Sequence, residues 1–251
     1  MADALRLFGL RAVVTDAASG IGEAIARTLV KHGAEVLAVD SANSGVETHF
    51  ESVRGIRGAV LDLFAADGAQ QLSELASAEL GVVDIVVCDV TPPTDAPIND
   101  ADDEALQALL KPKQDLVAGI SQKLLPLMKN SPAGRIIILG FIRSVFGRDG
   151  SASFRKSEAA IAGFTATLAA ETGPFGINAN YIQPGAIMTP ASRRVFKGDK
   201  ELRDFCIGGS AAKRLGEPVD VAKVALFLAT DDSVFVSGTG IVVDGGIAAS
   251  P

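Results

Sequence analysis

Residue types that commonly perform chemistry are few in this sequence, and they are widely separated. The 251 residues include two histidines, two cysteines and one tyrosine. His32 and His49 do not have the spacing of a metal site, so no metal centre is predicted. Cys88 and Cys206 lie far apart, and we expect two unpaired thiols in a reducing cytoplasm. The only tyrosine, Tyr181, lies in a predicted strand, where packing in the core is its expected role.

A segment between positions 190 and 216 is rich in basic residues, although the chain as a whole is acidic. Five lie within eleven positions, namely Arg193, Arg194, Lys197, Lys200 and Arg203. Such a group could bind an anion, for example a coenzyme A phosphate, or an acidic partner. Acidic residues are interleaved with them (Asp199, Glu201, Asp204), and a solvated helix face explains the pattern at least as well.

The overall composition is that of one acidic globular protein. Hydrophobic residues make up 48% of the chain, which is enough for one large core, and no linker, repeat or low-complexity tract divides it. A single domain over residues 1–251 is therefore predicted. The net charge of −7 argues against nucleic acid or an anionic membrane as a partner, because a polyanion would be repelled. No signal peptide or membrane-spanning run is recognised, so a cytoplasmic location is expected.

Apolar periodicity alternates between strands and helices along the whole chain. Strands are predicted at Ala12–Thr15, Glu35–Val39, Ala59–Leu61, Val83–Val87, Arg135–Leu139, Ala179–Ile182 and Gly240–Val243. Helices are predicted at Ile21–Lys31, Gly68–Leu80, Ser157–Thr172 and Val219–Ala229, with a further stretch from Asp103 that Pro112 interrupts and that resumes to Met128. Strict alternation predicts parallel strands joined by right-handed crossovers. The predicted fold is therefore a Rossmann-type, doubly wound α/β sheet.

Four motifs, in order along the chain, make the sequence resemble a known family. They are SGIG at 19–22, QPGAIMTP at 183–190, KRLGEP at 213–218 and FVSGTGIVVDGG at 235–246. With these motifs the chain resembles the short-chain dehydrogenase/reductase family from Leu10 to Gly246. The resemblance implies a homologue of oxidoreductases that pass a hydride between a nicotinamide and a hydroxyl or carbonyl carbon.

The resemblance also locates the four catalytic positions, which hold Asn, Ser, Tyr and Lys in active members. The segment FRKSEAAIAG aligns without a gap with the family stretch YSASKAAVAG, so Phe154 stands for Tyr and Glu158 for Lys. Counting from these landmarks puts Phe141 in place of Ser and Lys113 in place of Asn. A phenylalanine has no proton to transfer, and a glutamate reverses the charge beside the nicotinamide ribose. We therefore expect no catalytic residue of the family to remain.

Several positions that bind the dinucleotide in relatives keep a suitable residue. The family turn T-G-x-x-x-G-x-G corresponds to residues 15–22, and its last two glycines are retained. An acid at the end of the second strand binds the adenosine ribose in members that prefer NAD. The positions that the resemblance assigns to the cofactor are Gly20, Ile21, Gly22, Asp40 and Asp62.

Other changes in the same region oppose dinucleotide binding. Asp16 replaces the first glycine of the turn, and the family's N-N-A-G after the fourth strand is replaced by residues Cys88–Thr91. Two like charges about 5 Å apart cost on the order of 3 kcal/mol at an effective dielectric near 20, or about two decades of affinity. The expectation is therefore no cofactor, or weakly bound NAD.

The segments that form oligomer interfaces in relatives are better kept than the active site. In the family, helices matching residues 113–128 and 158–172 form one interface, and residues 235–246 belong to a second. This contrast suggests a subunit that supports an active paralogue in a hetero-oligomer such as a heterotetramer, although self-association into a dimer or tetramer is the alternative. The chain is similar to the silent subunit of the heteromeric benzylsuccinate-pathway dehydrogenase, whose substrate is a coenzyme A thioester.

Three functional hypotheses follow from the sequence. The first is a non-catalytic, structural or regulatory subunit of an NAD-dependent hydroxyacyl-CoA-type dehydrogenase. The second is a nucleotide or acyl-CoA sensor that uses what is left of the pocket. The third is an enzyme with different chemistry around Glu158, Arg155 or Asp89.

Overall fold

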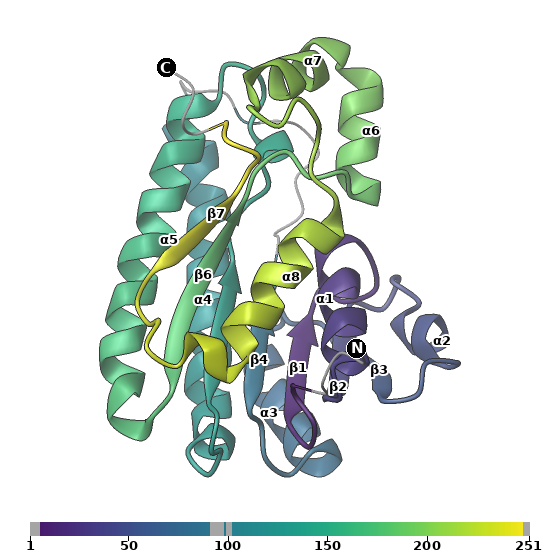
Figure 1. The fold of residues 1–251 in the computed structure, drawn as a ribbon, viewed down its shortest axis with the longest axis vertical. Helices are drawn as coiled ribbons and strands as arrows, with labels where there is room; N and C mark the ends of the chain where they lie inside the picture. The colour runs from purple at the N-terminus through teal and green to yellow at the C-terminus, as the bar shows by residue number, and fades with distance from the viewer. Residues whose placement is uncertain (1–5, 91–97, 99–101, 248–251) are drawn as a thin grey trace.

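Seven parallel strands form a single sheet in the order β3-β2-β1-β4-β5-β6-β7 (Figure 1). The computed structural model describes residues 6–90, 98 and 102–247. The strands are β1 (Arg11–Thr15), β2 (Glu35–Asp40), β3 (Ile56–Val60), β4 (Ile85–Cys88), β5 (Arg135–Leu139), β6 (Asn178–Pro184) and β7 (Gly240–Val243). The doubly wound α/β fold predicted from the alternating pattern is confirmed.

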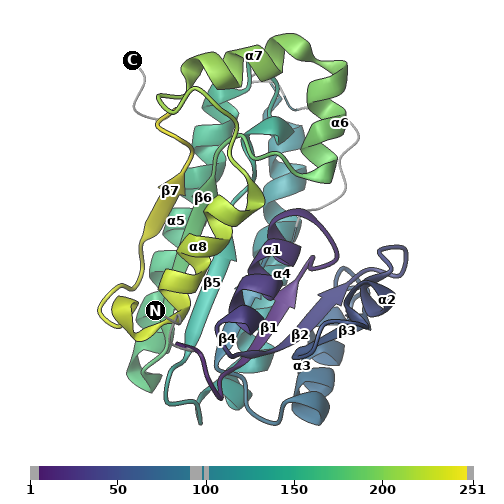
Figure 2. The same ribbon diagram turned by 45° about the vertical axis from the view of Figure 1, so that its right-hand side comes forward.

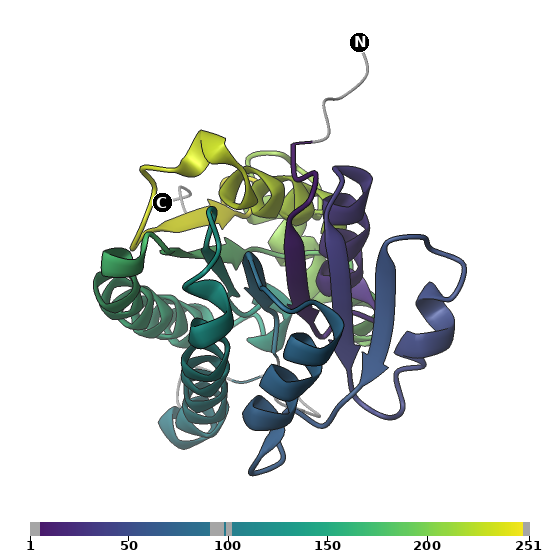
Figure 3. The same cartoon turned by 90° about the horizontal axis from the view of Figure 1, so that it is seen from below.

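Helices cover both faces of this sheet. One layer contains α1 (Gly20–Lys31) and α8 (Pro218–Ala229), and the other contains α3 (Gly68–Glu79), α4 (Asp103–Met128) and α5 (Ser151–Thr172), as Figure 3 shows end-on. Each layer has its own apolar core against the sheet. In α1, for example, Ile21, Ile25 and Leu29 recur at helical spacing and are all buried. None of the helices in the described residues is long and apolar enough to cross a membrane.

The sheet changes its winding direction between β1 and β4. The chain runs outward from β1 to β3 and then returns to place β4 beside β1, with Val14 opposite Val87. In such folds a crevice opens beyond the carboxyl ends of the two central strands, because their connections leave in opposite directions. Asp16 follows β1 directly and Asp89 follows β4, so two acidic residues stand at this point.

Two further helices lie over the carboxyl ends of the strands. They are α6 (Pro190–Gly198) and α7 (Lys200–Gly209), at the top of Figures 1 and 2. The Thr189 side chain accepts a hydrogen bond from Ser192 N at 3.1 Å to cap α6, and Asp199 accepts one from Leu202 N at 2.8 Å to cap α7. We call this pair of helices the lid.

Element boundaries differ from the sequence prediction at several places. Helix α4 continues through Pro112 rather than breaking there, because its buried face runs on without a gap from Leu109 to Leu116. Packing of that face offsets the hydrogen bond that proline removes, a loss worth about 3 kcal/mol. Helix α5 begins at Ser151, six residues earlier than predicted. The lid helices and the short α2 (Val46–Phe50) were not predicted as helices.

Candidate functional site

Three phenylalanine rings fill the region where the sequence places the catalytic positions. Phe141 follows β5, Phe154 lies in the first turn of α5, and Phe146 lies between them. The ring centroids of Phe141 and Phe146 are 6.0 Å apart, and those of Phe146 and Phe154 are 5.5 Å apart, both edge to face. Phe141 and Phe146 are fully buried. The sequence placed Phe141 and Phe154 at catalytic positions, and the structure adds Phe146, which sequence reasoning missed.

A buried arginine, also missed, holds this aromatic cluster against the lid. The guanidinium of Arg143 donates to the carbonyl oxygens of Phe146, Gly147 (2.8 Å) and Arg148 (3.2 Å). It also lies 5.7 Å from the Phe154 ring centroid and 5.8 Å from that of Phe205 on α7. Cation–π contacts of this kind stabilise by roughly 0.5–2 kcal/mol. No local sequence pattern indicates this role, because an isolated arginine after a strand is usually solvated.

Lys113 points into the interior rather than to solvent. Only 1% of its surface is exposed, and its Nζ lies 4.6 Å from the centroid of the Phe141 ring. Within the part of the chain that the structure describes, Nζ has no hydrogen-bond partner. Burial lowers the pKa of this amine, and the nearby carboxyl groups of Asp89 and Asp16 oppose that change. The two residues aligned with the family's Asn and Ser are thus brought into contact as an amine and an aromatic ring.

Two carboxyl groups accompany Lys113 at the crevice between β1 and β4. Burial raises the pKa of Asp16 to about 8, and the charges of Asp89 and Asp40 add to the increase. Burial likewise raises the pKa of Asp89 to about 6, with Lys113 acting in the opposite direction. We call Asp16, Asp89 and Lys113 the crevice cluster. Lys113 and Asp89 lower each other's cost of burial because their charges are opposite, whereas the charge of Asp89 adds to the cost of ionising Asp16.

The backbone around Asp16 keeps the shape of a glycine turn although the glycine is gone. Asp16 has φ 51°, in the left-handed region that glycine favours and that aspartate tolerates better than most residues. A Cβ at Gly22 would collide with the carbonyl group of Asp16, so a glycine at this last position of the turn is required for α1 to pack on it. Asp89 N donates to Thr15 Oγ1 at 3.1 Å and ties the ends of β1 and β4 together.

The remaining predicted cofactor positions make contacts within the chain. Asp40 Oδ2 accepts a hydrogen bond from Ala18 N at 2.8 Å, and Asp62 Oδ1 accepts one from Phe64 N at 3.0 Å. Gly20 has φ 61° and packs beside Thr189 at the start of α6, while Ile21 is buried in the core. These contacts neither require nor exclude a ligand, so the assignment of these positions stays a prediction. Thr91, the last of the four residues that replace the family's N-N-A-G, lies outside the described residues.

The crevice residues fit a nicotinamide dinucleotide poorly. The pyrophosphate of such a cofactor would approach the β1–α1 turn, where it meets helix N-terminal amides in this class of fold. Here the turn carries the Asp16 side chain, and Asp89 stands beside it. Burial already makes Asp16 costly to ionise, and a pyrophosphate dianion nearby would raise that cost further. No reaction step through a dinucleotide is therefore derived from this geometry.

Glu158 and the sole tyrosine lie on the side of α5 that faces the last strands. Burial and the charge of Asp244 raise the pKa of Glu158. Burial and Glu158 raise the pKa of Tyr181, which moves this phenol further from proton transfer at neutral pH. Tyr181 packs against the apolar core as predicted, and a Cβ at Gly240 would collide with its ring.

Both cysteines are buried and free of disulfide bonds. Burial raises the pKa of Cys88 to about 12 and that of Cys206 to about 11, so neither thiol is activated as a nucleophile. Among the described residues, no group of three or more His, Cys, Asp or Glu side chains could hold a metal ion.

Comparison with known proteins identifies the family of this fold. The family model described as enoyl-(acyl carrier protein) reductase matches residues 17–248. The 3-oxoacyl-(acyl-carrier-protein) reductase of Escherichia coli K12 is 30% identical over 241 residues, which cover 95% of this chain and 97% of the relative. The corresponding Thermotoga maritima reductase is 28% identical over 247 residues, covering 97% and 99%.

A solved structure extends the similarity to three dimensions. A gluconate 5-dehydrogenase from Burkholderia cenocepacia, crystallised with NADP and tartrate, superposes with a TM-score of 0.85 at 26% identity, covering 99% of both chains. The structural superposition and the sequence match therefore point to the same family. The chain belongs to the short-chain dehydrogenase/reductase family of NAD(P)-dependent oxidoreductase homologues.

Proposed function

We propose that this protein is a catalytically silent member of its family and serves as the structural or regulatory subunit of a heteromeric NAD-dependent dehydrogenase. The observation that carries the proposal is the packed cluster of Phe141, Phe146 and Phe154. These rings take the volume that a substrate oxygen and its hydrogen-bond donors need, and none of them can transfer a proton. Lys113 beside this cluster has its amine buried against an aromatic ring.

The outer face of α5 supports a role in assembly. Ala159, Gly163, Ala166, Thr167 and Ala170 are small residues at helical spacing, and all five are exposed in the single chain. A Cβ at Gly163 would have no described atom within 4 Å. Small side chains let a second helix approach closely, so this face suits packing against a helix of another subunit. The face belongs to the segment that forms an interface in relatives.

The substrate class proposed for the complex is a hydroxyacyl thioester of coenzyme A. The curated relatives act, by their names, on 3-oxoacyl groups attached to a carrier protein. The proposed substrate carries its acyl group on coenzyme A in place of a carrier protein. In the proposed complex the active paralogue supplies the catalytic residues. The present chain packs the exposed face of its helix α5 against that paralogue.

Reconstitution tests the proposal. The chain is co-expressed with a short-chain dehydrogenase of the same organism that keeps its Ser, Tyr and Lys, and the pair is passed through size-exclusion chromatography. We expect co-elution, NAD-dependent oxidation of a 3-hydroxyacyl-CoA by the pair, and none by the chain alone. Ala166→Arg on the exposed face of α5 should abolish co-elution, whereas Ser77→Arg on the exposed face of α3 should not.

Two outcomes would contradict the proposal. A stable homotetramer that ignores every paralogue removes the subunit role. Hydride transfer by the purified chain alone removes the catalytic silence. The two parts of the proposal can therefore fail separately.

The cofactor crevice gives a second test. Asp16→Gly removes the carboxyl group and restores the residue that the φ of 51° favours. We expect the variant to bind NADH up to about 100-fold more tightly than the wild type at pH 9, where Asp16 with its pKa of about 8 is ionised, because about 3 kcal/mol of charge repulsion is then removed. Nucleotide fluorescence measures the affinity. Asp67→Gly, at an exposed position before α3, is the control and should leave the affinity unchanged. Equal affinity of wild type and Asp16→Gly would show that Asp16 does not block the crevice.

A further inference from the structure

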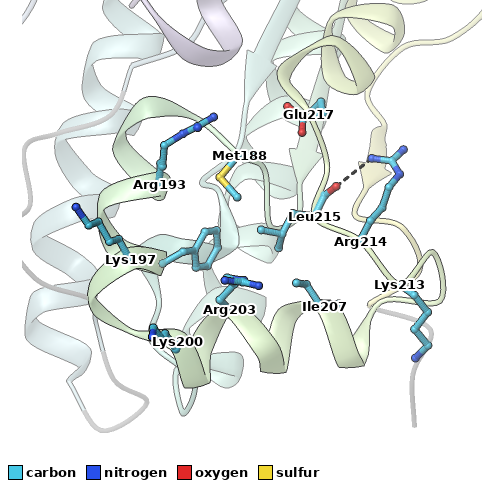
Figure 4. Close-up of a pocket in the computed structure, with 11 residues that line it drawn as sticks. Met188, Arg193, Lys197, Lys200, Arg203, Ile207, Lys213, Arg214, Leu215 and Glu217 are labelled. Carbon is cyan, nitrogen blue, oxygen red and sulfur yellow. Dashed lines mark hydrogen bonds between the residues drawn. The ribbon is translucent and has the colours of Figure 1, made fainter.

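We infer that a cavity on the outer side of the lid binds a small phosphorylated molecule with an apolar portion. The cavity has a volume of about 660 Å³ and lies between α6, α7 and the loop 213–217 (Figure 4). Its walls are formed by Met188, Arg193, Phe196, Lys197, Lys200, Arg203, Ile207, Lys213, Arg214, Leu215 and Glu217. Pockets for small ligands commonly measure about 300–1,000 Å³, so the size is that of a nucleotide site. The inference does not depend on the proposed subunit role.

This cavity is separated from the catalytic positions by helix α7 itself. Phe205 points to the inner side, where its ring lies 5.8 Å from the Arg143 guanidinium. Leu202 and Cys206 are buried under the helix. Arg203 and Ile207 are one turn apart on the outer side and line the cavity. The cavity is therefore distinct from the region of Phe141, Phe146 and Phe154.

The charge around the cavity is strongly unbalanced. Six of the lining residues are lysine or arginine and Glu217 is the only acid among them, in a chain whose net charge is −7. Three of the six have partners: Arg214 with Asp220 at 2.7 Å, Arg203 with Asp204 at 3.8 Å, and Lys213 with the Gly208 carbonyl oxygen at 2.6 Å.

The other three cations have no ion pair within the described residues. Arg193, Lys197 and Lys200 are all exposed and border the same hollow. Cations held together in this way repel one another, and a concave surface concentrates their field. A ligand with two or more phosphates would compensate the repulsion, with arginine offering a planar pair of donors and lysine a point charge.

The floor of the cavity is apolar. Met188, Ile207 and Leu215 present carbon and sulfur between the cationic side chains, and the buried Phe196 also lines the cavity. A bare inorganic ion would leave this surface uncovered. A base or acyl part attached to the phosphates would bury it and gain about 25 cal/mol per Å² of apolar surface removed from water. Free nucleotides and the nucleotide part of coenzyme A share this chemistry, and the test separates them.

The test is isothermal titration of the full-length protein with ADP, coenzyme A and pyrophosphate, each used separately. The cavity variant is Arg193→Gln/Lys197→Gln/Lys200→Gln. The control is Arg194→Gln/Lys123→Gln/Lys223→Gln, which removes the same charge from exposed positions outside the cavity. We expect ADP or coenzyme A to bind the wild type more tightly than pyrophosphate. The cavity variant should bind at least tenfold more weakly, and the control within about twofold of wild type.

Tighter binding of coenzyme A than of ADP would identify the coenzyme as the source of the phosphates, and the reverse order a free nucleotide. Absence of heat with all three probes at millimolar concentration overturns the inference, as does an equal loss in the cavity and control variants. Binding of an acidic peptide in place of all three probes also overturns it, because the site would then recognise a protein. None of these outcomes depends on hydride transfer or on co-elution with a paralogue.

Discussion

The crevice cluster and the lid cavity both contain basic residues, and they differ in what balances the charge. In the crevice, Lys113 is buried beside Asp16 and Asp89, so charges of both signs lie together away from water. Around the lid cavity, Arg193, Lys197 and Lys200 face solvent without an acidic partner in the described part of the chain. Groups that balance one another inside a protein contribute to its fold. Positive charges without an acidic partner on a concave surface attract an anionic ligand.

The proposed ligand cavity and the region of the catalytic positions lie on opposite sides of α7. The inner side of α7 contacts a closed region of rings and a buried arginine. The outer side of the same helix borders an open cavity. Helix α7 thus separates the buried region around Arg143 from the open lid cavity.

The largest expected effect comes from removing the cation of the crevice cluster. Lys113→Met keeps the length of the side chain and leaves Asp89 and Asp16 buried without a neighbouring positive charge. We expect the free energy of unfolding at pH 7 to fall by about 3 kcal/mol, the usual loss when one partner of a buried charge group is deleted. Chemical denaturation monitored by circular dichroism measures it.

Lys111→Met is the matched control for this prediction. Lys111 lies on the same helix but is exposed, where its ion pair with Asp115 should contribute less than about 1 kcal/mol. The loss in Lys113→Met should shrink at pH 5, because protonation of Asp89, whose pKa is about 6, removes the uncompensated charge. A variant as stable as wild type at pH 7 would mean that Lys113 is neutral in the fold and that the crevice is not a balanced charge cluster.

A smaller effect is expected in the dependence of stability on pH. The pKa of Asp16 is about 8 in the fold and 3.8 as the ordinary value, so the folded state binds more protons than the unfolded state between these limits. The contribution of Asp16 to the free energy of unfolding should therefore be complete below pH 4. It should decrease by a few kcal/mol as the pH rises toward 8. The pKa of about 6 for Asp89 adds a decrease between pH 4 and 6.

Asp16→Asn isolates this contribution. Asparagine tolerates the left-handed backbone of Asp16 and does not titrate, so the fall in stability from pH 5 to pH 8 should be clearly smaller than in wild type. The lowered pKa of Lys113 acts in the opposite sense, because it makes stability rise with pH between the lowered and the ordinary pKa of a lysine, and this contribution remains in the variant. Parallel stability curves for the two proteins would show that Asp16 is ionised in the fold at neutral pH.

The fold could be predicted from the sequence because it depends on repeated local patterns. Most strands contain a short apolar run, and helices such as α1 have apolar residues every three or four positions. Each such pattern supports the same alternation of strands and helices, so an error at one boundary does not change the topology. Pro112 was misleading because its local cost is offset by long-range packing of α4. The lid helices were missed because their charged residues outnumber the few apolar ones that bury their inner face.

Site residues could be predicted only at positions that the alignment with the family identifies as catalytic. Alignment located Lys113, Phe141 and Phe154, and the structure brings Lys113 against Phe141. It could not show that the Phe146 ring would complete the cluster, or that Arg143 would turn inward. Such contacts depend on the packing of segments that are distant in sequence. The basic cluster of the lid was recognised in sequence, but its hollow shape is a property of the folded chain.

The smallest expected effect concerns the lid cavity, where removal of a cation should not harm the fold. Lys197→Gln takes away one exposed charge from a group of like charges, so the free energy of unfolding should stay within about 0.5 kcal/mol of wild type or rise slightly. Any gain should vanish at high salt, because screening weakens the repulsion that the substitution relieves. Thermal unfolding at low and high salt measures both. A loss above about 1 kcal/mol would show that Lys197 has an internal partner, and the contrast between a balanced crevice and an unbalanced cavity would then fail at this residue.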